Sequence, residues 1–181
     1  MNASGNTVRG RVKPLRVLLA EDDPADVALV EESLAAHALP AELHHVPDGV
    51  EAMAFLRRQG QYADAPRPEL ILLDLNMPRL NGREVLAKIK VDPGLKAIPV
   101  VVFTTSAIDV DVLASYSAHA NAYVAKPVDL DDFERAVERI HRFYGGTATL
   151  PPPIRMQPEN ERSAPGAAAT AALDTPAETP R

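Results

Sequence analysis

The chain has 181 residues, of which 46% are hydrophobic and 24% are charged, and this fits one globular domain with some additional sequence. The formal net charge of −6 does not favour binding to nucleic acid or to an anionic membrane. Cysteine is absent, which excludes disulfides, zinc–thiolate sites and a cysteine nucleophile.

The two ends of the chain differ in composition from its middle. Residues 1–14 are polar and lack the apolar run of a secretory signal, so we expect a flexible leader there. Seven of the 17 prolines fall in the last 31 residues, where large apolar side chains are rare, and such a segment cannot offset the entropy of ordering. We therefore expect a Pro/Ala-rich disordered tail over residues 146–181 and one domain over residues 15–145. Because no apolar run is long enough to span a membrane, we expect a cytoplasmic protein.

Short apolar runs alternate with amphipathic stretches inside the expected domain. Residues 16–20, 70–74 and 100–104 are almost continuously apolar, which is typical of central parallel strands covered on both faces. Residues 42–46 and 122–125 are less apolar and fit strands nearer an edge.

Apolar side chains between these runs recur at helical spacing, and a weaker helix is expected over residues 110–118. Asp23 before Pro24 predicts where the first helix begins, and Asp129 with Asp132 predicts the start of the last helix. The helical sets are Val27, Val30 and Leu34; Val50, Met53 and Leu56; Val85, Leu86 and Ile89; and Phe133, Val137, Ile140 and Tyr144. Five strands alternating with five helices predict one doubly wound α/β domain with a parallel sheet.

Polar residues follow four of the expected strands, at the edge where doubly wound sheets bind their ligands. They are Glu21 and Asp22, Asp74 and Asn76, Thr104 and Ser106, and Lys126. Like charges about 5 Å apart repel by ~3 kcal/mol, so such an acidic cluster does not favour stability by itself. A Mg²⁺ ion would offset the repulsion and still accept phosphate oxygens, with an ammonium and a hydroxyl beside it. The set therefore points to phosphoryl transfer to a carboxylate.

Each of these residues also has a purely structural explanation when taken singly. Asp23 and its acidic neighbours can cap a helix, where negative charge is favoured. Asp74 can be a solvated acid at a strand end, and Lys126 can be an ordinary loop lysine. The occurrence of all four strand ends in this order favours the functional interpretation.

The order Glu21-Asp22, Asp74 with Asn76-Met77-Pro78 and Gly82, Thr104, and Lys126-Pro127 resembles the receiver domain of bacterial two-component response regulators. The resemblance covers about residues 15–145. It implies a flavodoxin-like fold with strand order 2-1-3-4-5 and phosphotransfer from a phosphohistidine of a sensor histidine kinase. It also implies that the phosphorylated form signals through contact with a downstream protein, and that the only reactions catalysed are its own phosphorylation and dephosphorylation.

Carried over by position, the resemblance implies a role for each site residue. Asp74 would be the phosphoacceptor, and Lys126 and Thr104 would contact the phosphoryl group. Tyr123 would follow Thr104 inward as part of a switch, and Pro127 would follow a cis peptide bond. The Mg²⁺ ligands would be Glu21, Asp22, Asp74 and the backbone carbonyl of Asn76. The residues that tune self-hydrolysis would be Asn76 and Ser106.

A narrower resemblance is to the stand-alone regulators that partner bacterial phytochromes, which are red-light-sensing histidine kinases. It is carried by residues 21–26, by the loop over residues 62–68, by residues 115–130 and by the ending Phe143-Tyr144 with Leu150-Pro151. Members of that group pair through the last strand and helices, so a homodimer is implied as a possibility. Residues 150–154 are then either an arm that reaches the other copy or a plain linker.

Two other functions fit the same fold. A metal-dependent aspartyl phosphatase of the haloacid dehalogenase type needs a second aspartate two positions after the first, and Asn76 cannot donate that proton. A scaffold that is never phosphorylated is disfavoured because every expected site residue is present.

Overall fold

The structure, a computed structural model, describes residues 13–106 and 108–152. Most of the predicted leader and the predicted tail beyond residue 152 lie outside the described residues. The strands are β1 (Leu15–Ala20), β2 (Ala41–Val46), β3 (Leu70–Leu73), β4 (Val100–Thr104) and β5 (Ala122–Ala125). The α-helices are α1 (Pro24–Ala36), α2 (Gly49–Leu56), α3 (Gly82–Val91), α4 (Asp109–Ser117) and α5 (Leu130–Arg142). A short 3-10 helix, η1 (Gly60–Tyr62), and a π-helical turn, η2 (Phe143–Thr147), complete the described elements.

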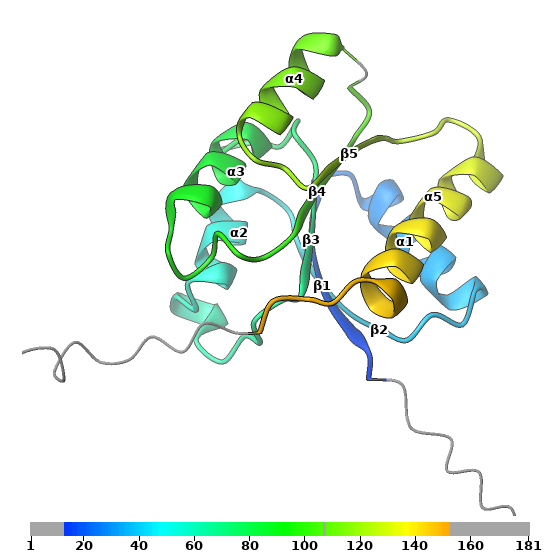
Figure 1. Cartoon of the computed structure of the whole chain (residues 1–181), viewed down its shortest axis with the longest axis horizontal. Coiled ribbons are helices and arrows are strands. Elements are labelled where there is room, and N and C mark those ends of the chain that lie inside the picture. Colours follow the sequence, from blue (N-terminus) through cyan, green and yellow to red (C-terminus); the bar gives the residue numbers. More distant parts are fainter. Residues whose placement is uncertain (1–12, 107, 153–181) are drawn as a thin grey trace, which may run out of the picture.

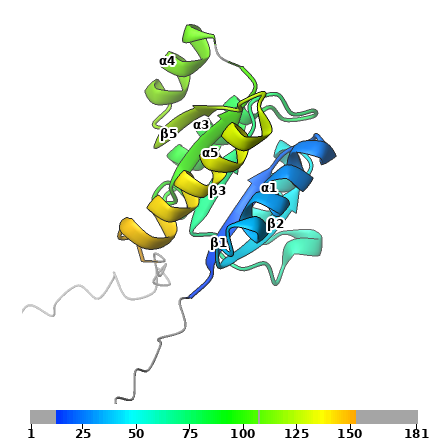
Figure 2. The same cartoon turned by 90° about the vertical axis from the view of Figure 1, so that its right-hand side faces the viewer.

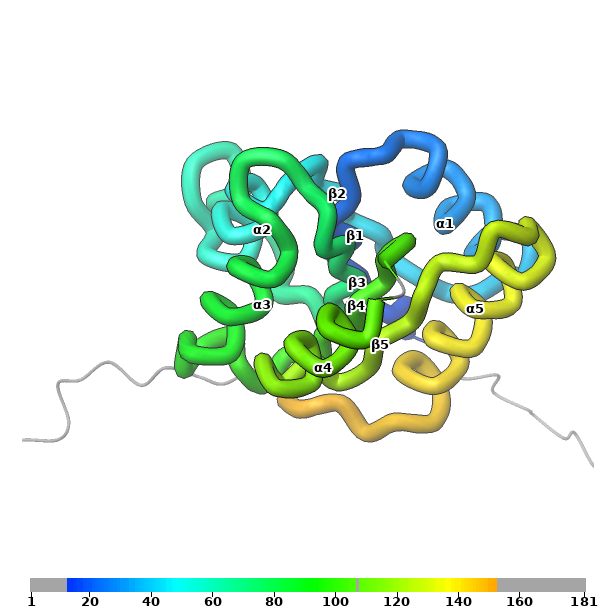
Figure 3. The backbone as a smooth tube through the Cα atoms, turned by 90° about the horizontal axis from the view of Figure 1, so that it is seen from above, coloured from blue at the N-terminus to red at the C-terminus, as the bar shows by residue number. Residues whose placement is uncertain are grey.

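The five strands form one parallel sheet in the order β2-β1-β3-β4-β5, which confirms the predicted fold and strand order. Helices α1 and α5 cover one face of this sheet and lie side by side (Figures 1 and 2). Helices α2 and α3 cover the other face, and α4 lies beside the edge strand β5 (Figure 3). None of the described helices is long and apolar enough to cross a membrane.

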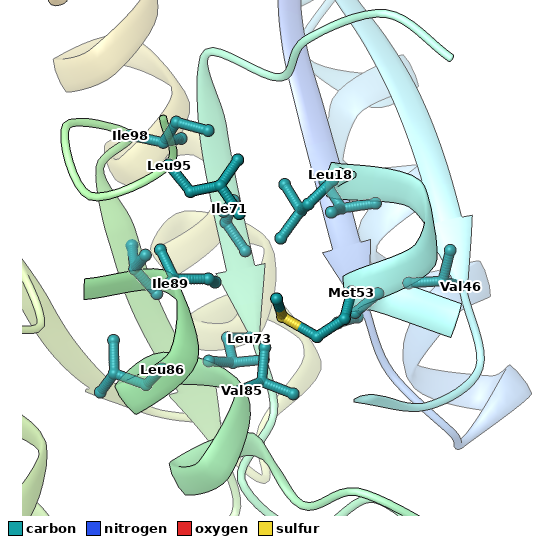
Figure 4. Packing of buried hydrophobic residues seen from close by; sticks show 14 of the residues in the cluster. Leu18, Val46, Met53, Ile71, Leu73, Val85, Leu86, Ile89, Leu95 and Ile98 are labelled. Carbon is teal, nitrogen blue, oxygen red and sulfur yellow. The ribbon is translucent and has the colours of Figure 1, made fainter. Parts of the chain in front are cut away.

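A separate apolar core lies on each face of the sheet. Leu18 in β1 faces the core beneath α2 and α3 (Figure 4), whereas its neighbours Val17 and Leu19 face the core beneath α1 and α5. The central strands β3 and β4 alternate in the same way, so every position along them is buried. Burial on both faces is the reason that these strands are continuously apolar in sequence.

Side-chain caps fix where the helices begin. The Asp23 carboxylate accepts a hydrogen bond from the backbone N–H of Ala25 at 2.9 Å, with Pro24 as the first helical residue of α1. Asp129 accepts from the N–H of Asp132 at 3.0 Å and starts α5. Both predicted helix starts are confirmed.

The segment after α5 crosses the amino edge of the sheet. Helix α5 ends at Arg142, so Tyr144 lies in the π-helical turn rather than in the helix, although it packs against the same core. Leu150 packs against that core as well, and Pro151 lines a small cavity with Arg16 and Pro99. Leu150 is therefore held on the domain while most of residues 146–152 stay exposed, and the described chain enters and leaves at this edge (Figure 1).

Candidate functional site

The carboxyl ends of four strands, and the loops that follow them, carry the predicted site residues. Glu21 and Asp22 follow β1, Asp74 follows β3, Thr104 ends β4, and Lys126 follows β5. Because the strands are parallel, their carboxyl ends meet at the same edge. The structure thus brings together residues that are up to 105 positions apart along the chain.

Three carboxylates form a compact acidic cluster at this edge. Glu21, Asp22 and Asp74 each offer one oxygen, and these atoms lie within 4.8 Å of one another. Glu21 and Asp74 are buried, whereas Asp22 is exposed. Asp74 Oδ1 is buried and has no hydrogen-bond partner among the described residues, which is unusual for a buried polar atom.

The Lys126 ammonium group is buried among carboxylates. Its Nζ donates to Glu21 Oε2 at 2.5 Å and to Asp26 Oδ2 at 2.7 Å. Asp74 Oδ2 lies farther away, at 3.6 Å, and forms an ion pair with Nζ. The ammonium therefore contacts three acids, and of these Asp74 lies farthest from Nζ.

Burial and charge act in opposite directions on the pKa values of Glu21 and Lys126. Burial raises the pKa of Glu21 from 4.5 to about 7, and the contacts with Lys126 offset only part of this effect. Burial alone would lower the pKa of Lys126, but the hydrogen bonds that it donates to Asp26 and Glu21 and the charge of Asp74 raise it above its usual value. The ammonium is therefore charged at neutral pH, while the Glu21 carboxyl beside it holds its proton to an unusually high pH.

Close backbone packing explains the glycine that follows Asp74 in the motif. A Cβ atom on Gly82 would lie 2.0 Å from the backbone oxygen of Asp74. The Gly82 N–H donates to the carbonyl of Leu75 at 3.0 Å, which holds the start of α3 against the end of β3. A side chain at this position would displace the loop that carries Asp74.

The predicted switch residues are linked through Ser106. Thr104 is fully buried, and its Oγ1 accepts from the N–H of Ser106 at 3.4 Å. The Tyr123 hydroxyl donates to the Ser106 carbonyl at 2.8 Å, and Ser106 Oγ donates to Asp111 on α4 at 2.5 Å. Arg83 on α3 pairs with the other oxygen of Asp111. This chain of contacts connects the site with α4. Asp111 and Arg83 carried no sequence signal, unlike the three predicted residues in the chain.

The structure corrects one implied feature and reveals one residue that the sequence did not assign. The described residues contain no cis peptide bond, so the implied cis bond before Pro127 is wrong, and the trans form is the one that X–Pro bonds favour by about 0.5–1 kcal/mol. Lys126 reaches the acids without it. Asp26 in the first turn of α1 contacts Lys126, and its sequence signal was limited to its place in the acidic opening of the motif. Asn76 is exposed, and its predicted roles stay predictions.

The donor set fits a hard divalent cation. All of the side-chain donors are carboxylate oxygens, which Mg²⁺ prefers. The partnerless Asp74 Oδ1 leaves a buried acceptor free, and the exposed Asp22 leaves a side of the cluster open to water, which Mg²⁺ retains when bound.

Known proteins resemble this chain in sequence and in fold. The sequence profile of the response regulator receiver domain matches residues 17–138. Response regulator Rcp1 of Synechocystis is 51% identical over 138 residues, which cover 76% of this chain and 94% of Rcp1.

Solved structures agree with this comparison. The phosphorylated cyanobacterial phytochrome response regulator RcpA is 50% identical, with a TM-score of 0.74 over 77% of this chain and 99% of RcpA. The Mn²⁺-bound form of Rcp1 is 51% identical, with a TM-score of 0.73 over 77% of this chain and all (100%) of that chain. The bacteriophytochrome response regulator RtBRR is 36% identical, with a TM-score of 0.61 over 78% of this chain and 84% of its own.

Proposed function

Since this chain belongs to the response regulator receiver domain family, we propose that it is a stand-alone response regulator whose Asp74 accepts a phosphoryl group from a sensor histidine kinase. The observation that carries this proposal is the buried, partnerless Oδ1 of Asp74, a carboxylate that clusters with two further acids and pairs through Oδ2 with the Lys126 ammonium. A free buried carboxylate oxygen beside a fixed cation is what a nucleophilic aspartate requires.

The chemistry is the exchange of one phosphoryl bond for another. An oxygen of Asp74 forms the O–P bond while the N–P bond of the phosphohistidine breaks, and the histidine nitrogen keeps the electron pair of that bond. Lys126 then holds one of the phosphoryl oxygens, and the Thr104 hydroxyl donates to another. Mg²⁺, when held by Glu21, Asp22, Asp74 and the Asn76 carbonyl, supplies neutralisation of the negative charge that gathers there. Asn76 and Ser106 tune hydrolysis of the product, and Tyr123 follows Thr104 to report the change.

The names of the relatives support a light-sensing partner. RcpA is described as a phytochrome response regulator and RtBRR as a bacteriophytochrome response regulator. We therefore propose a phytochrome-type histidine kinase as the phosphoryl donor, a downstream protein as the recipient of the signal, and the cytoplasm as the place where both contacts occur.

Pairing of two copies through the last strand and its neighbouring helices is part of the same proposal. It is supported by apolar side chains on α4, where Val110 and Leu113 are 72% and 70% exposed. Leu150 packs against its own domain, which favours the linker interpretation over the arm for the described part of residues 150–154. Residues 153 and 154 lie outside the described residues.

A phosphorylation assay tests the proposal. The full chain is incubated in Mg²⁺ with labelled acetyl phosphate and, separately, with phosphorylated phytochrome-type kinases in red light and in darkness. We expect an acid-stable, hydroxylamine-sensitive label that Asp74→Asn abolishes and that Asp64→Asn, which changes an exposed aspartate, leaves intact. A label that survives Asp74→Asn would move the phosphosite elsewhere. The absence of any label would favour the scaffold, and turnover of a phosphate ester would favour the phosphatase.

A further inference from the structure

The contacts of Lys126 assign a role to a residue outside the proposed set of metal ligands and phosphoryl contacts. Asp26 occupies the first turn of α1, and Lys126 lies 100 positions later, after β5. Asp26 Oδ2 accepts a hydrogen bond from Lys126 Nζ at 2.7 Å, whereas the distance from Nζ to Asp74 Oδ2 is 3.6 Å. The ammonium therefore donates a hydrogen bond to the helix, whereas its contact with the proposed phosphoacceptor is a longer ion pair.

We propose that Asp26 is a positioning residue that holds the Lys126 ammonium away from Asp74 until a phosphoryl group is attached there. This inference rests on the proposed function. It adds that Asp26 competes with the phosphoryl group on Asp74 for the Lys126 ammonium. An ammonium has three N–H donors, and Glu21 and Asp26 accept two short hydrogen bonds from it. As a result, Asp74 keeps a free oxygen for a cation or an incoming phosphorus atom.

The competition changes in favour of Asp74 once that residue is phosphorylated. A phosphoryl group carries about −1.5 to −2 charges at neutral pH and offers three acceptor oxygens, against a single negative charge on Asp26. Asp26 is also the more weakly held acid, because its side chain is 22% exposed while those of Lys126 and Glu21 are 3% and 2% exposed. Water can therefore replace Lys126 at Asp26 more readily than at Glu21.

The competing explanation is that Asp26 only stabilises the positive end of α1 or ties this helix to β5. That role predicts a change in stability without a change in Mg²⁺ affinity or phosphorylation rate. The two roles are therefore separated by measuring the site rather than the fold.

The test compares Asp26→Asn with Glu31→Gln in the full chain. Glu31 is an exposed acid on the same helix, so the control removes the same charge from α1 without touching Lys126. Mg²⁺ binding is measured by isothermal titration calorimetry, and labelling by acetyl phosphate is measured at saturating Mg²⁺. Thermal unfolding in EDTA of both variants and of a second variant, Asp26→Ala, shows whether the fold is retained.

The freed ammonium is expected to approach Asp74 and compete with the metal, so Asp26→Asn should weaken Mg²⁺ binding on the order of tenfold. At saturating Mg²⁺ the same variant should be labelled faster, also on the order of tenfold, because one charge-assisted hydrogen bond no longer has to break. Glu31→Gln should match the wild type within about twofold in both measurements, since exposed charges are screened.

Opposite results have distinct meanings. If Asp26→Asn matches Glu31→Gln in both measurements, or is labelled more slowly at saturating Mg²⁺, and Asp26→Ala does the same when it is put through both measurements, Asp26 serves the helix alone. This inference is then wrong while the proposed function stands. If the wild type is not labelled at all, the proposed function fails, and the Mg²⁺ titration still decides whether Asp26 controls the position of Lys126.

Discussion

Replacing Glu21 with glutamine should remove a large part of the pH dependence of stability. The Glu21 side chain is 2% exposed, and burial raises its pKa from 4.5 to about 7 despite its hydrogen bond with Lys126. Below pH 4.5 both the folded and the unfolded chain hold this proton. Between pH 4.5 and about 7 the folded chain alone holds it, so the free energy of unfolding falls as pH rises through this window and then levels off.

The size of the fall follows from the shift. A shift of one pKa unit corresponds to 1.36 kcal/mol, so the change from 4.5 to about 7 corresponds to about 3 kcal/mol. Because a small domain has a total stability of about 5–15 kcal/mol, this contribution is measurable. Mg²⁺ at 100 times its dissociation constant adds about 2.7 kcal/mol if it binds the folded form alone. Protons compete for the same oxygens, so Mg²⁺ should stabilise most at high pH and flatten the profile.

Urea unfolding followed by circular dichroism provides the measurement, since the chain contains no tryptophan. The free energy of unfolding is determined from pH 5 to pH 8 in EDTA for the wild type, for Glu21→Gln and for the exposed-site control Glu31→Gln. The difference between wild type and Glu21→Gln should change by about 2.5 kcal/mol across this range, because pH 5 already lies above the unfolded pKa of 4.5, while the control follows the wild type. Parallel curves for the wild type and Glu21→Gln would refute the assignment of this proton to Glu21.

Three shorter predictions concern packing and the chain end. Gly82→Ala should destabilise the domain by about 1–3 kcal/mol, because its Cβ would lie 2.0 Å from the Asp74 carbonyl oxygen, whereas Gly146→Ala meets nothing within 4 Å; equal melting temperatures would contradict this. Asp48→Asn should destabilise by about 1 kcal/mol at neutral pH, because asparagine can still cap α2 but lacks the charge that pairs with Arg79, and this loss should vanish in acid. Burial raises the pKa of Asp48, but hydrogen bonds from the α2 backbone and from an arginine outweigh it and lower that pKa. The stabilisation by ionised Asp48 is therefore lost as pH falls through the lowered pKa. A difference in stability between the wild type and Asp48→Asn that persists in acid would argue against an ionised cap. Deleting residues 145–181 should leave labelling intact, and weaker association in sedimentation velocity would support an arm, whereas unchanged association would support a linker.

The sheet was predictable because its central strands are buried on both faces. Continuous apolarity in β3 and β4, and the caps Asp23 and Asp129, are local signals that the tertiary structure reinforces. The end of the domain was less predictable. Residues after α5 have the composition of a disordered tail, yet Leu150 packs against the core. This contact could not be predicted, because a single apolar residue produces no periodic pattern.

The sequence was enough to predict which residues meet at the site, but not all of the contacts that they form there. Chain order was sufficient to place Glu21, Asp74 and Lys126 at one edge of a parallel sheet. The contact between Asp26 and Lys126 could not be inferred, because it depends on how the first turn of α1 is rotated relative to the end of β5. The trans bond before Pro127 was missed for a related reason, since it depends on the loop and not on the residue pair.

The route of the chain across the amino edge of the sheet has a practical consequence for labelling and immobilising this protein. A strand of six residues such as β1 is about 20 Å long, so the described ends lie a full strand length from Asp74. A fluorophore, an affinity handle or a surface tether attached at residue 13 or residue 152 would therefore lie on the side of the domain opposite the acids and any partner docked over them. The domain can be immobilised or fluorescently labelled at these positions while its carboxyl edge stays accessible to solvent.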